Sequence, residues 1–177
     1  MKPNLTLIDF DRSFIHPLAG VDEVGRGTLA GPVIAAAVIL DFKNLPDDIN
    51  DSKKVSKKNR EIISTKILEN SITSIGHATV EEIDDINILR ASLLAMKRAV
   101  EGLSKKPKLV LIDGNQIPDI KIESKSIIKG DNKSLSIAAA SIIAKVYRDN
   151  LMTEYSEKYP GYFWEKNSGY GTKEHIE

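Results

Sequence analysis

The chain has 177 residues, and its 25 lysine and arginine residues equal its 25 aspartate and glutamate residues in number, so its formal net charge is zero. Hydrophobic residues make up 41% of the sequence, which is enough apolar material for a buried core. Cysteine is absent, which excludes disulfides, cysteine-ligated zinc and thiol nucleophiles. No apolar run approaches the roughly 20 residues that cross a bilayer. We therefore expect one cytoplasmic domain over residues 1–177 with no membrane partner.

The first half of the chain predicts three strands and one helix. Two short apolar runs flank a glycine-rich segment, the pattern of two strands joined by a turn. A polar loop, a helix that serine can cap and a β-branched segment follow. In chain order we expect strands over Leu18–Val24 and Pro32–Leu40 around the turn Gly25–Gly31, a loop over Asp41–Lys54, a helix from Ser56 to Asn70 and a strand over Ser71–Val80.

The second half alternates helices with strands. Apolar residues from Leu89 to Leu103 fall at alternating steps of four and three, which predicts a helix with one buried face. Before this helix we expect a helical stretch that opens at Glu81–Asp85, and after it strands over Lys108–Gly114 and Lys121–Ile128. A long helix over Ile137–Tyr159, begun by Ser134 or Ser136, and an aromatic, glycine-rich segment over Tyr162–Glu177 complete the chain. Three antiparallel strands followed by alternating strands and helices predict an α/β fold with a mixed central sheet flanked by helices.

Four acidic residues stand beside or near glycine at strand ends or in the loop before the long helix. They are Asp22 and Glu23 before Gly25, Asp113 before Gly114, and Asp131 after Gly130. Strand ends at one edge of a sheet converge, and clustered carboxylates repel one another unless protons or cations neutralise them. Oxygen ligands select Mg²⁺ or Mn²⁺ rather than zinc. Two such ions roughly 3.5–4 Å apart can activate water to hydrolyse a phosphodiester.

Each acid taken alone has a simpler explanation, because aspartate beside glycine is ordinary turn chemistry. Asp22 and Glu23 are also neighbours, whose side chains point to opposite faces of a regular strand. Both reach one pocket only where the strand ends or kinks, and the glycine that follows permits this. The segment Gly20–Thr28 is close to a phosphate-binding P-loop, but it has Arg26 in place of lysine and Gly27 in place of serine or threonine. We therefore favour a nuclease over a nucleotide triphosphatase.

Seven motifs follow one another along nearly the whole chain. They are Gly20-Val-Asp-Glu-Val-Gly-Arg-Gly-Thr-Leu-Ala-Gly-Pro-Val33, Asn50-Asp-Ser-Lys-Lys54, Ile86-Asn-Ile-Leu89, Leu111-Ile-Asp-Gly-Asn115, Lys129-Gly-Asp131, Ser136-Ile-Ala-Ala-Ala-Ser-Ile-Ile-Ala-Lys145 and Gly169-Tyr-Gly-Thr-Lys-Glu-His175. In this order they resemble type 2 ribonuclease H, ribonuclease HII, of the bacterial type. The resemblance implies a ribonuclease H-like fold for the mixed sheet predicted above.

The resemblance also implies an activity. It is that of a metal-dependent endonuclease that cuts the RNA strand of RNA–DNA hybrids and the 5′ side of single ribonucleotides embedded in duplex DNA, leaving 3′-hydroxyl and 5′-phosphate ends. Metal binding and catalysis are assigned to Asp22, Glu23, Asp113 and Asp131, the acids selected above. The implied cofactor is Mg²⁺ or Mn²⁺, with two ions during catalysis, and the implied roles are primer removal and ribonucleotide repair.

Six further residues are candidate substrate contacts. In the family that the chain resembles, the Gly25-Arg26-Gly27 backbone and Tyr170 sense the ribose 2′-hydroxyl, the group that distinguishes RNA from DNA. The Arg26 side chain could neutralise a phosphate or pair with Glu23 across the turn, and the resemblance favours the phosphate. Tyr170 could be an ordinary exposed aromatic. Lys53 and Ser134 are candidate phosphate contacts. Their simpler roles are a solvated basic face for Lys53 and a helix cap for Ser134.

The chain departs from the family pattern near its end. Family members usually continue past the Gly-Tyr-Gly-Thr motif, and they commonly carry a basic His-Lys pair where this chain has Asn167-Ser168. We therefore expect the C-terminal extension to be absent and substrate affinity to be reduced. Two alternatives stay open: a non-catalytic nucleic-acid-binding module with this fold, and type 3 ribonuclease H, which usually carries an added N-terminal domain. We expect a monomer, and the sequence identifies no sliding-clamp partner.

A net charge of zero argues, at first, against a nucleic-acid partner. The charges are unevenly distributed, however, because four acids belong to the predicted cation site. The basic residues gather in two other clusters, Lys53, Lys54, Lys57, Lys58 and Arg60, and Lys121, Lys125, Lys129 and Lys133. With cations bound, the substrate face can be locally positive. We therefore expect RNA–DNA hybrid and ribonucleotide-containing duplex DNA as partners, bound with modest, salt-sensitive affinity.

Overall fold

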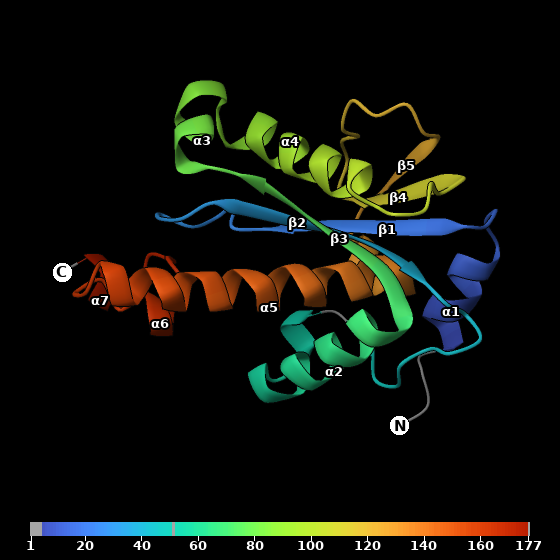
Figure 1. The fold of residues 1–177 in the computed structure, drawn as a ribbon, viewed down its shortest axis with the longest axis horizontal. Coiled ribbons are helices and arrows are strands. Elements are labelled where there is room, and N and C mark those ends of the chain that lie inside the picture. The colour runs from blue at the N-terminus through green and yellow to red at the C-terminus, as the bar shows by residue number, and fades with distance from the viewer. Residues whose placement is uncertain (1–4, 51, 177) are drawn as a thin grey trace.

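A five-stranded mixed sheet organises the computed structural model, which describes residues 5–50 and 52–176 (Figure 1). The strands are β1 (Leu18–Val24), β2 (Val33–Leu40), β3 (Ser71–Ala78), β4 (Leu109–Asp113) and β5 (Ser124–Ile127), in the spatial order β3-β2-β1-β4-β5. The first three strands pair antiparallel, whereas β4 runs parallel to both β1 and β5. The predicted α/β fold with a mixed central sheet is confirmed.

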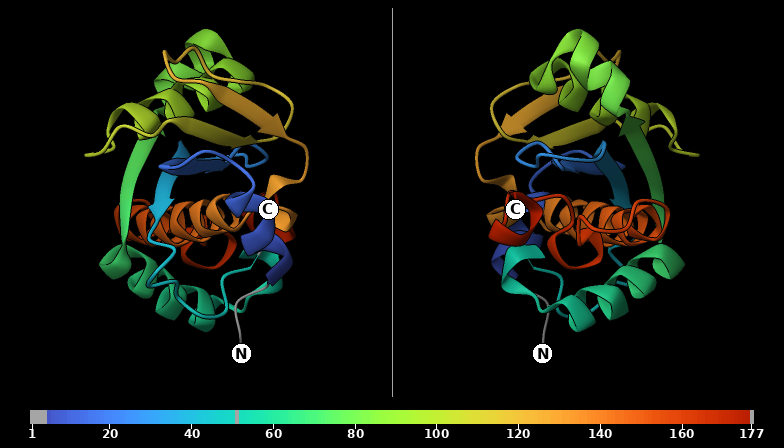
Figure 2. Two further views of the ribbon diagram at one scale, coloured as in Figure 1. Left: turned by 90° about the vertical axis from the view of Figure 1, so that its right-hand side faces the viewer. Right: turned by 90° about the vertical axis from the view of Figure 1, so that its left-hand side faces the viewer.

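Helices cover both faces of this sheet. They are α1 (Leu5–Arg12), α2 (Lys57–Asn70), α3 (Val80–Ile86), α4 (Ile88–Glu101), α5 (Leu135–Lys158), α6 (Trp164–Asn167) and α7 (Lys173–Ile176), with single 3-10 turns at Ser52–Lys54 and Gly130–Asn132. Viewed along the sheet, α4 lies on one face and α5 on the other, with α2 beyond α5 (Figure 2). None of the helices in the described part of the chain has the length and apolar character to cross a membrane.

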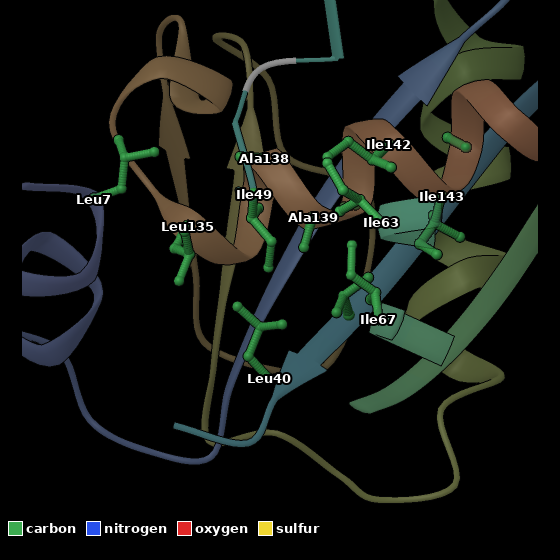
Figure 3. Close-up of a cluster of buried hydrophobic side chains, with 14 of the residues drawn as sticks. Leu7, Leu40, Ile49, Ile63, Ile67, Leu135, Ala138, Ala139, Ile142 and Ile143 are labelled. Carbon is green, nitrogen blue, oxygen red and sulfur yellow. The ribbon is translucent and has the colours of Figure 1, made fainter. Parts of the chain in front are cut away.

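Two hydrophobic layers hold the helices against the sheet. On one face, Met96 and Val100 of α4 pack with Val21 and other small apolar residues of β1 and β2. On the other face, Ile63 and Ile67 of α2 meet α5 and β2 in a cluster of aliphatic side chains (Figure 3). Every residue of β2 is buried, as expected for a strand covered on both faces. The strand ends that carry the predicted acids are thereby fixed between α4 and α5.

The structure differs from the predicted elements mainly at the chain's two ends. The helix α1 has no counterpart in the prediction, yet it buries Leu7 and Ile8 against α5. The segment expected to be only aromatic and glycine-rich contains the short helices α6 and α7. The strand predicted over Lys121–Ile128 forms ladder pairs only from Ser124 to Ile127. Asp51, in one of the sequence motifs, lies outside the described residues.

Candidate active site

A cavity of about 330 Å³ opens where β1 and β4 end. Nine of the ten predicted site residues line it, and Ser134 does not. The complete lining is Asp22, Glu23, Val24, Gly25, Arg26, Gly27, Ser52, Lys53, Arg60, Asp113, Asp131, Ser141, Lys145 and Tyr170. Residues that are more than 140 positions apart in the sequence therefore share one concave site.

Parallel pairing of β1 and β4 brings the acids together. Val21 lies opposite Ile112, so Asp22 and Asp113 come next on neighbouring strands. The strand β1 ends at Val24, followed by a glycine with a φ of 97°, at the place where the sequence predicted its end. Asp131 arrives from the single turn that precedes α5. The four acids therefore line one pocket, as their positions in the sequence led us to expect.

Glu23 reaches the site from the other face of the sheet. Besides the main cavity, it lines a smaller one of about 120 Å³ together with Leu93 and Met96 of α4. Adjacent residues of a strand face opposite sides, and Glu23 can approach Asp22 only because the strand ends one residue later. The acidic pair thus projects carboxylates from both sides of the sheet's edge.

The carboxylates lie in an environment that disfavours their negative charge. Burial raises the pKa of Asp22 well above its ordinary value, and the charges of Glu23, Asp113 and Asp131 raise it further. Burial also raises the pKa of Glu23, followed by the charge of Asp113, while the charge of Arg26 acts in the opposite direction. The cluster gains stability when a proton or a cation neutralises it.

Three of the four carboxylates, those of Asp22, Asp113 and Asp131, contact nitrogen donors in this structure. Asp22 Oδ1 accepts the Glu23 N–H at 2.7 Å, and Asp113 Oδ1 accepts the Gly130 N–H at 2.6 Å. Asp131 accepts from the Asn132 amide and lies 4.0 Å from Lys53 Nζ. Among residues 5–50 and 52–176, no three acidic or histidine side chains form a ready-made ligand set for one ion.

The residues nevertheless suit a hard divalent cation. Glu23 Oε2 is buried and has no hydrogen-bond partner within the described residues. A buried carboxylate oxygen without a donor is costly, and a cation would satisfy it. All the negatively charged atoms that could ligate a metal here are carboxylate oxygens, which favours Mg²⁺ or Mn²⁺ over softer metals. The donor set and the raised pKa values of Asp22 and Glu23 are therefore consistent with a cation site.

The predicted sugar-sensing residues form one rim of the cavity. Gly25 is buried, whereas Arg26 and Gly27 are exposed. A β-carbon added at Gly27 would meet nothing within 4 Å, so a ligand can approach this backbone closely. Tyr170 is 38% exposed, and its ring centroid lies 5.4 Å from the ammonium nitrogen of Lys145. The loop and the aromatic ring therefore face the same space as the acids.

The two predicted phosphate contacts lie in different surroundings. The Lys53 side chain is 84% exposed at the cavity, beside Asp131. Ser134 is fully buried, and its hydroxyl accepts the Ile137 N–H at 3.2 Å as the cap of α5. The simpler role weighed for Ser134, a helix cap, is thus present in the structure. Its contact with phosphate stays a prediction.

Sequence reasoning gave no role to Ser52, Ser141 and Lys145, and it placed Arg60 on a solvated face, although all four line the cavity. Ser141 and Lys145 lie four residues apart on α5, one above the other on the same helix face. Both fall in the Ser136–Lys145 motif, so the motif contained the signal. Arg60 is turned inward by hydrogen bonds to the Ser52 and Val55 carbonyls at 2.8 and 2.7 Å.

Comparisons with known proteins agree with this fold and identify the family. The family model of ribonuclease HII matches residues 19–177. A ribonuclease HII of Zymomonas mobilis is 56% identical over 180 residues, covering 99% of this chain and 84% of its own. One from Roseobacter denitrificans is 52% identical over 160 residues, covering 90% of this chain and 81% of its own.

Solved structures give the same result. Ribonuclease H2 from Pyrococcus horikoshii superposes with a TM-score of 0.75 at 27% identity, covering 90% of this chain and 82% of that one. A ribonuclease HII of Archaeoglobus fulgidus, solved in complex with PCNA, gives a TM-score of 0.69 at 26% identity, over 90% of this chain and 84% of that one. A Bst ribonuclease HIII with Mn²⁺ shares the fold, with a TM-score of 0.71 at 22% identity over 80% of this chain and 54% of its own.

The mixed sheet, its acidic cavity and these relatives define the protein's class: it is an endoribonuclease with a ribonuclease H-like fold. More specifically, the chain belongs to the ribonuclease HII family. The alternative of a non-catalytic binding module is therefore not favoured. Ribonuclease HIII proteins share the fold, but the family match over residues 19–177 is to type 2.

Proposed function

We propose that the protein hydrolyses the RNA strand of RNA–DNA hybrids and cuts duplex DNA on the 5′ side of a single embedded ribonucleotide, leaving 3′-hydroxyl and 5′-phosphate ends. The cofactor is Mg²⁺ or Mn²⁺, with two ions acting together, and the biological role is ribonucleotide excision repair. Residues 1–177 act as one catalytic domain and as a monomer. The cytoplasmic location expected from the sequence stays a prediction.

One observation carries this proposal: the acids, the glycine loop and Tyr170 line the same cavity. A nuclease that recognises a ribonucleotide in DNA must bring its cleavage chemistry within one nucleotide of a group that reads the 2′-hydroxyl. Here Asp22 and Asp113 share the cavity with the exposed residues Arg26 and Gly27. This arrangement supports a ribose-sensing endonuclease over a general phosphodiesterase.

Each group of residues has a proposed role. Asp22, Glu23, Asp113 and Asp131 would hold the divalent cations, which supply an activated water and stabilise the leaving oxygen. Arg26 and Lys53 bring positive charge to the cavity wall and would bind the phosphates that flank the cut bond. The Gly25–Gly27 backbone would bind the 2′-hydroxyl, and Tyr170 would pack on the adjoining deoxyribose. Ser134 caps the N-terminal end of α5, and a phosphate would contact it only at that end of the helix.

A cleavage assay tests the proposal. Purified protein with Mg²⁺ or Mn²⁺ is incubated with a DNA duplex that carries one ribonucleotide, with a long RNA–DNA hybrid and with an all-DNA duplex. We expect cleavage of the first two and none of the third, and no cleavage of any after chelation. An intact one-ribonucleotide duplex under conditions in which another ribonuclease HII cuts it would overturn the embedded-ribonucleotide activity.

The products test the chemistry separately. Hydrolysis as proposed yields a 3′ end that a DNA polymerase can extend and a 5′ end that a ligase can join without a kinase. A 2′,3′-cyclic phosphate would instead point to attack by the ribose hydroxyl itself. Finding such an end would remove the proposed role of an activated water.

A further inference from the structure

Arg148, in the middle of α5, is completely buried although it carries a positive charge. Its guanidinium donates four hydrogen bonds. Nε reaches the Pro32 carbonyl at 3.0 Å, Nη1 the Ser168 carbonyl at 2.5 Å, and Nη2 the Ala30 carbonyl at 2.8 Å and the Thr28 hydroxyl at 3.0 Å. Every acceptor is uncharged, and Arg148 forms no ion pair within residues 5–50 and 52–176. The nearest acid in sequence, Asp149, bonds instead to Lys145 and Ser168.

These bonds join two loops that lie far apart in the sequence. Three of the acceptors belong to residues 28–32, directly after the Gly25–Gly27 turn. The fourth acceptor, Ser168, stands two residues before Tyr170. The loops also touch each other, because the Leu29 N–H donates to the Gly169 carbonyl at 2.9 Å. Arg148 is thus the shared support of both rims of the cavity, although it does not line the cavity itself.

Thr28 extends this support to the sugar-sensing turn. Its hydroxyl accepts from Arg148 and donates to the Gly25 carbonyl at 2.9 Å. Gly25 also rests directly on the guanidinium, because a β-carbon there would lie 2.5 Å from Arg148 Nε. Its φ of 97° is in the region that favours glycine. A continuous path of contacts therefore runs from Arg148 to the backbone beside Arg26 and Gly27.

We propose that Arg148 is a positioning residue that fixes the Gly25–Gly27 backbone relative to Tyr170, so that selectivity for a ribonucleotide followed by a deoxyribonucleotide depends on it. This inference rests on the proposed function, since it assigns the origin of that selectivity. A planar guanidinium suits the task because its donors diverge in a fixed geometry toward several carbonyls. A lysine ammonium offers three donors from a single atom and cannot span the same acceptors.

The inference separates two properties of the enzyme. The acids are positioned by β1, β4 and the turn before α5, and none of them contacts Arg148. Loss of Arg148 should therefore lower the selectivity for the ribose 2′-hydroxyl more than it lowers the rate of the hydrolytic step. A long hybrid offers many equivalent cutting positions, so its cleavage should continue when the rim of the cavity is displaced. A single embedded ribonucleotide offers only one position, so its cleavage should be slower when the rim is displaced.

Two variants and one control test this. Arg148→Lys keeps the charge but loses the multiple bonds, and Thr28→Val removes only the hydroxyl between Arg148 and Gly25. Thr153→Val is the control, because this partly buried hydroxyl of α5 bonds the Asp149 carbonyl at 3.0 Å. The measured quantities are kcat and KM on a one-ribonucleotide duplex and on a long hybrid, with the free energy of unfolding of each variant.

We expect the ratio of kcat/KM between the one-ribonucleotide duplex and the hybrid to fall about tenfold in Arg148→Lys, as suits the loss of hydrogen bonds from a charged group. A fall of roughly threefold is expected in Thr28→Val, where one neutral link is lost, and none in Thr153→Val. Amide exchange at Leu29 should also be faster in the first two. If Arg148→Lys does not fold, Thr28→Val alone decides.

A purely structural role would give another pattern. Activity on both substrates would then fall together, in step with lost stability, and the ratio would stay constant. That result would overturn the inference and leave the proposed function intact. Failure of the proposed function itself is recognised separately, because the unaltered protein would then leave the one-ribonucleotide duplex uncut.

Discussion

A β-carbon placed on Gly20 would lie 2.2 Å from the carbonyl carbon of Ser136, because the first turn of α5 packs directly on the middle of β1. This contact sets the height of the helix above the sheet. The turn that carries Asp131 immediately precedes α5, so the same contact places Asp131 over the ends of β1 and β4. Gly20 thus helps to assemble the acidic cavity without lining it.

Substituting Gly20 by alanine should destabilise the protein. The methyl group would collide with the backbone of Ser136 and Ile137, which cannot rotate away. Overpacking against a rigid neighbour costs about 3 kcal/mol, which corresponds to a fall in Tm of about 10 °C in a chain of this length. Urea unfolding and thermal unfolding measure the effect.

Gly27→Ala is the matched control for stability. No heavy atom lies within 4 Å of a β-carbon at Gly27, and its φ is not in the left-handed region. We expect its free energy of unfolding to change by less than about 0.5 kcal/mol. Equal losses in the two variants would contradict the role assigned to the Gly20 contact.

Asp113→Asn should separate activity from stability. The amide keeps an Oδ1 that can accept the Gly130 N–H, whereas the lost charge is one that raises the pKa of both Asp22 and Glu23. Stability in EDTA should therefore be unchanged or higher. Turnover should fall by more than about a hundredfold, because even residues that only orient a metal ligand contribute 10–100-fold.

The measurements are kcat with Mg²⁺ and with Mn²⁺, and unfolding with and without each ion. Bound cation should raise the Tm of the unaltered protein, and this increase should be smaller in Asp113→Asn. An active Asp113→Asn protein would remove the residue from the mechanism. A clearly destabilised one would show that the Asp113 carboxylate supports the fold rather than strains it.

The central part of the fold could be predicted because local pattern and burial agree there. The apolar run that forms β2 and the spaced apolar residues of α4 reflect their packing, since Met96 and Val100 face the sheet. The helix α1 could not be predicted in this way. An aspartate is ordinarily exposed to solvent, but Asp11 of α1 is buried and accepts from the Ser136 N–H and hydroxyl at 2.7 and 2.6 Å. Only tertiary structure supplies that partner.

Among the residues that form or support the cavity, some could be predicted from the sequence and others could not. Asp22, Glu23 and Asp113 stand at strand ends, where topology alone predicts convergence, and the structure places them together. Arg148 gave no signal, because a basic residue in a long helix is ordinarily exposed. Its role depends on carbonyls from two loops that approach only in the folded chain. A backbone carbonyl can accept such a bond whatever its side chain, so these acceptors could not be identified from the sequence.

Lys145→Gln should weaken substrate binding. The ammonium lines the cavity, lies 2.8 Å from Asp149 Oδ1 and stands beside the Tyr170 ring, so it contributes positive charge next to the acids. We expect KM to rise several-fold and kcat to change little. Loss of one phosphate contact should also make the salt dependence of log KM shallower, by about one unit of slope.

Lys97→Gln on α4 is the comparison for Lys145→Gln. This lysine is also partly exposed, but its partners are Glu101 and Asp119 at 4.0 and 3.8 Å, and it does not line the cavity. Its KM and salt slope should match those of the unaltered protein. Equal slopes in all three proteins would exclude a phosphate contact by Lys145.

The buried Asp11 should make stability depend on pH in a predictable direction. Burial raises its pKa above the ordinary value of 3.8, although hydrogen bonds from Ser134 and Ser136 oppose this. The folded chain therefore binds this proton more tightly than the unfolded chain does. The resulting stabilisation is present at acidic pH and is lost as the pH rises above 3.8 through the raised pKa.

Comparison with Asp11→Asn isolates this effect, because asparagine does not titrate. Urea unfolding in EDTA from pH 4 to pH 8 should show the unaltered protein losing stability relative to the variant as the pH rises. Asp84→Asn, an exposed acid on α3, controls for the loss of one negative charge and should show no such trend. If the difference between Asp11→Asn and the unaltered protein grew with pH in favour of aspartate, the Asp11 carboxylate would be stabilised as an anion. The hydrogen bonds from Ser136 would then outweigh burial at the start of α5.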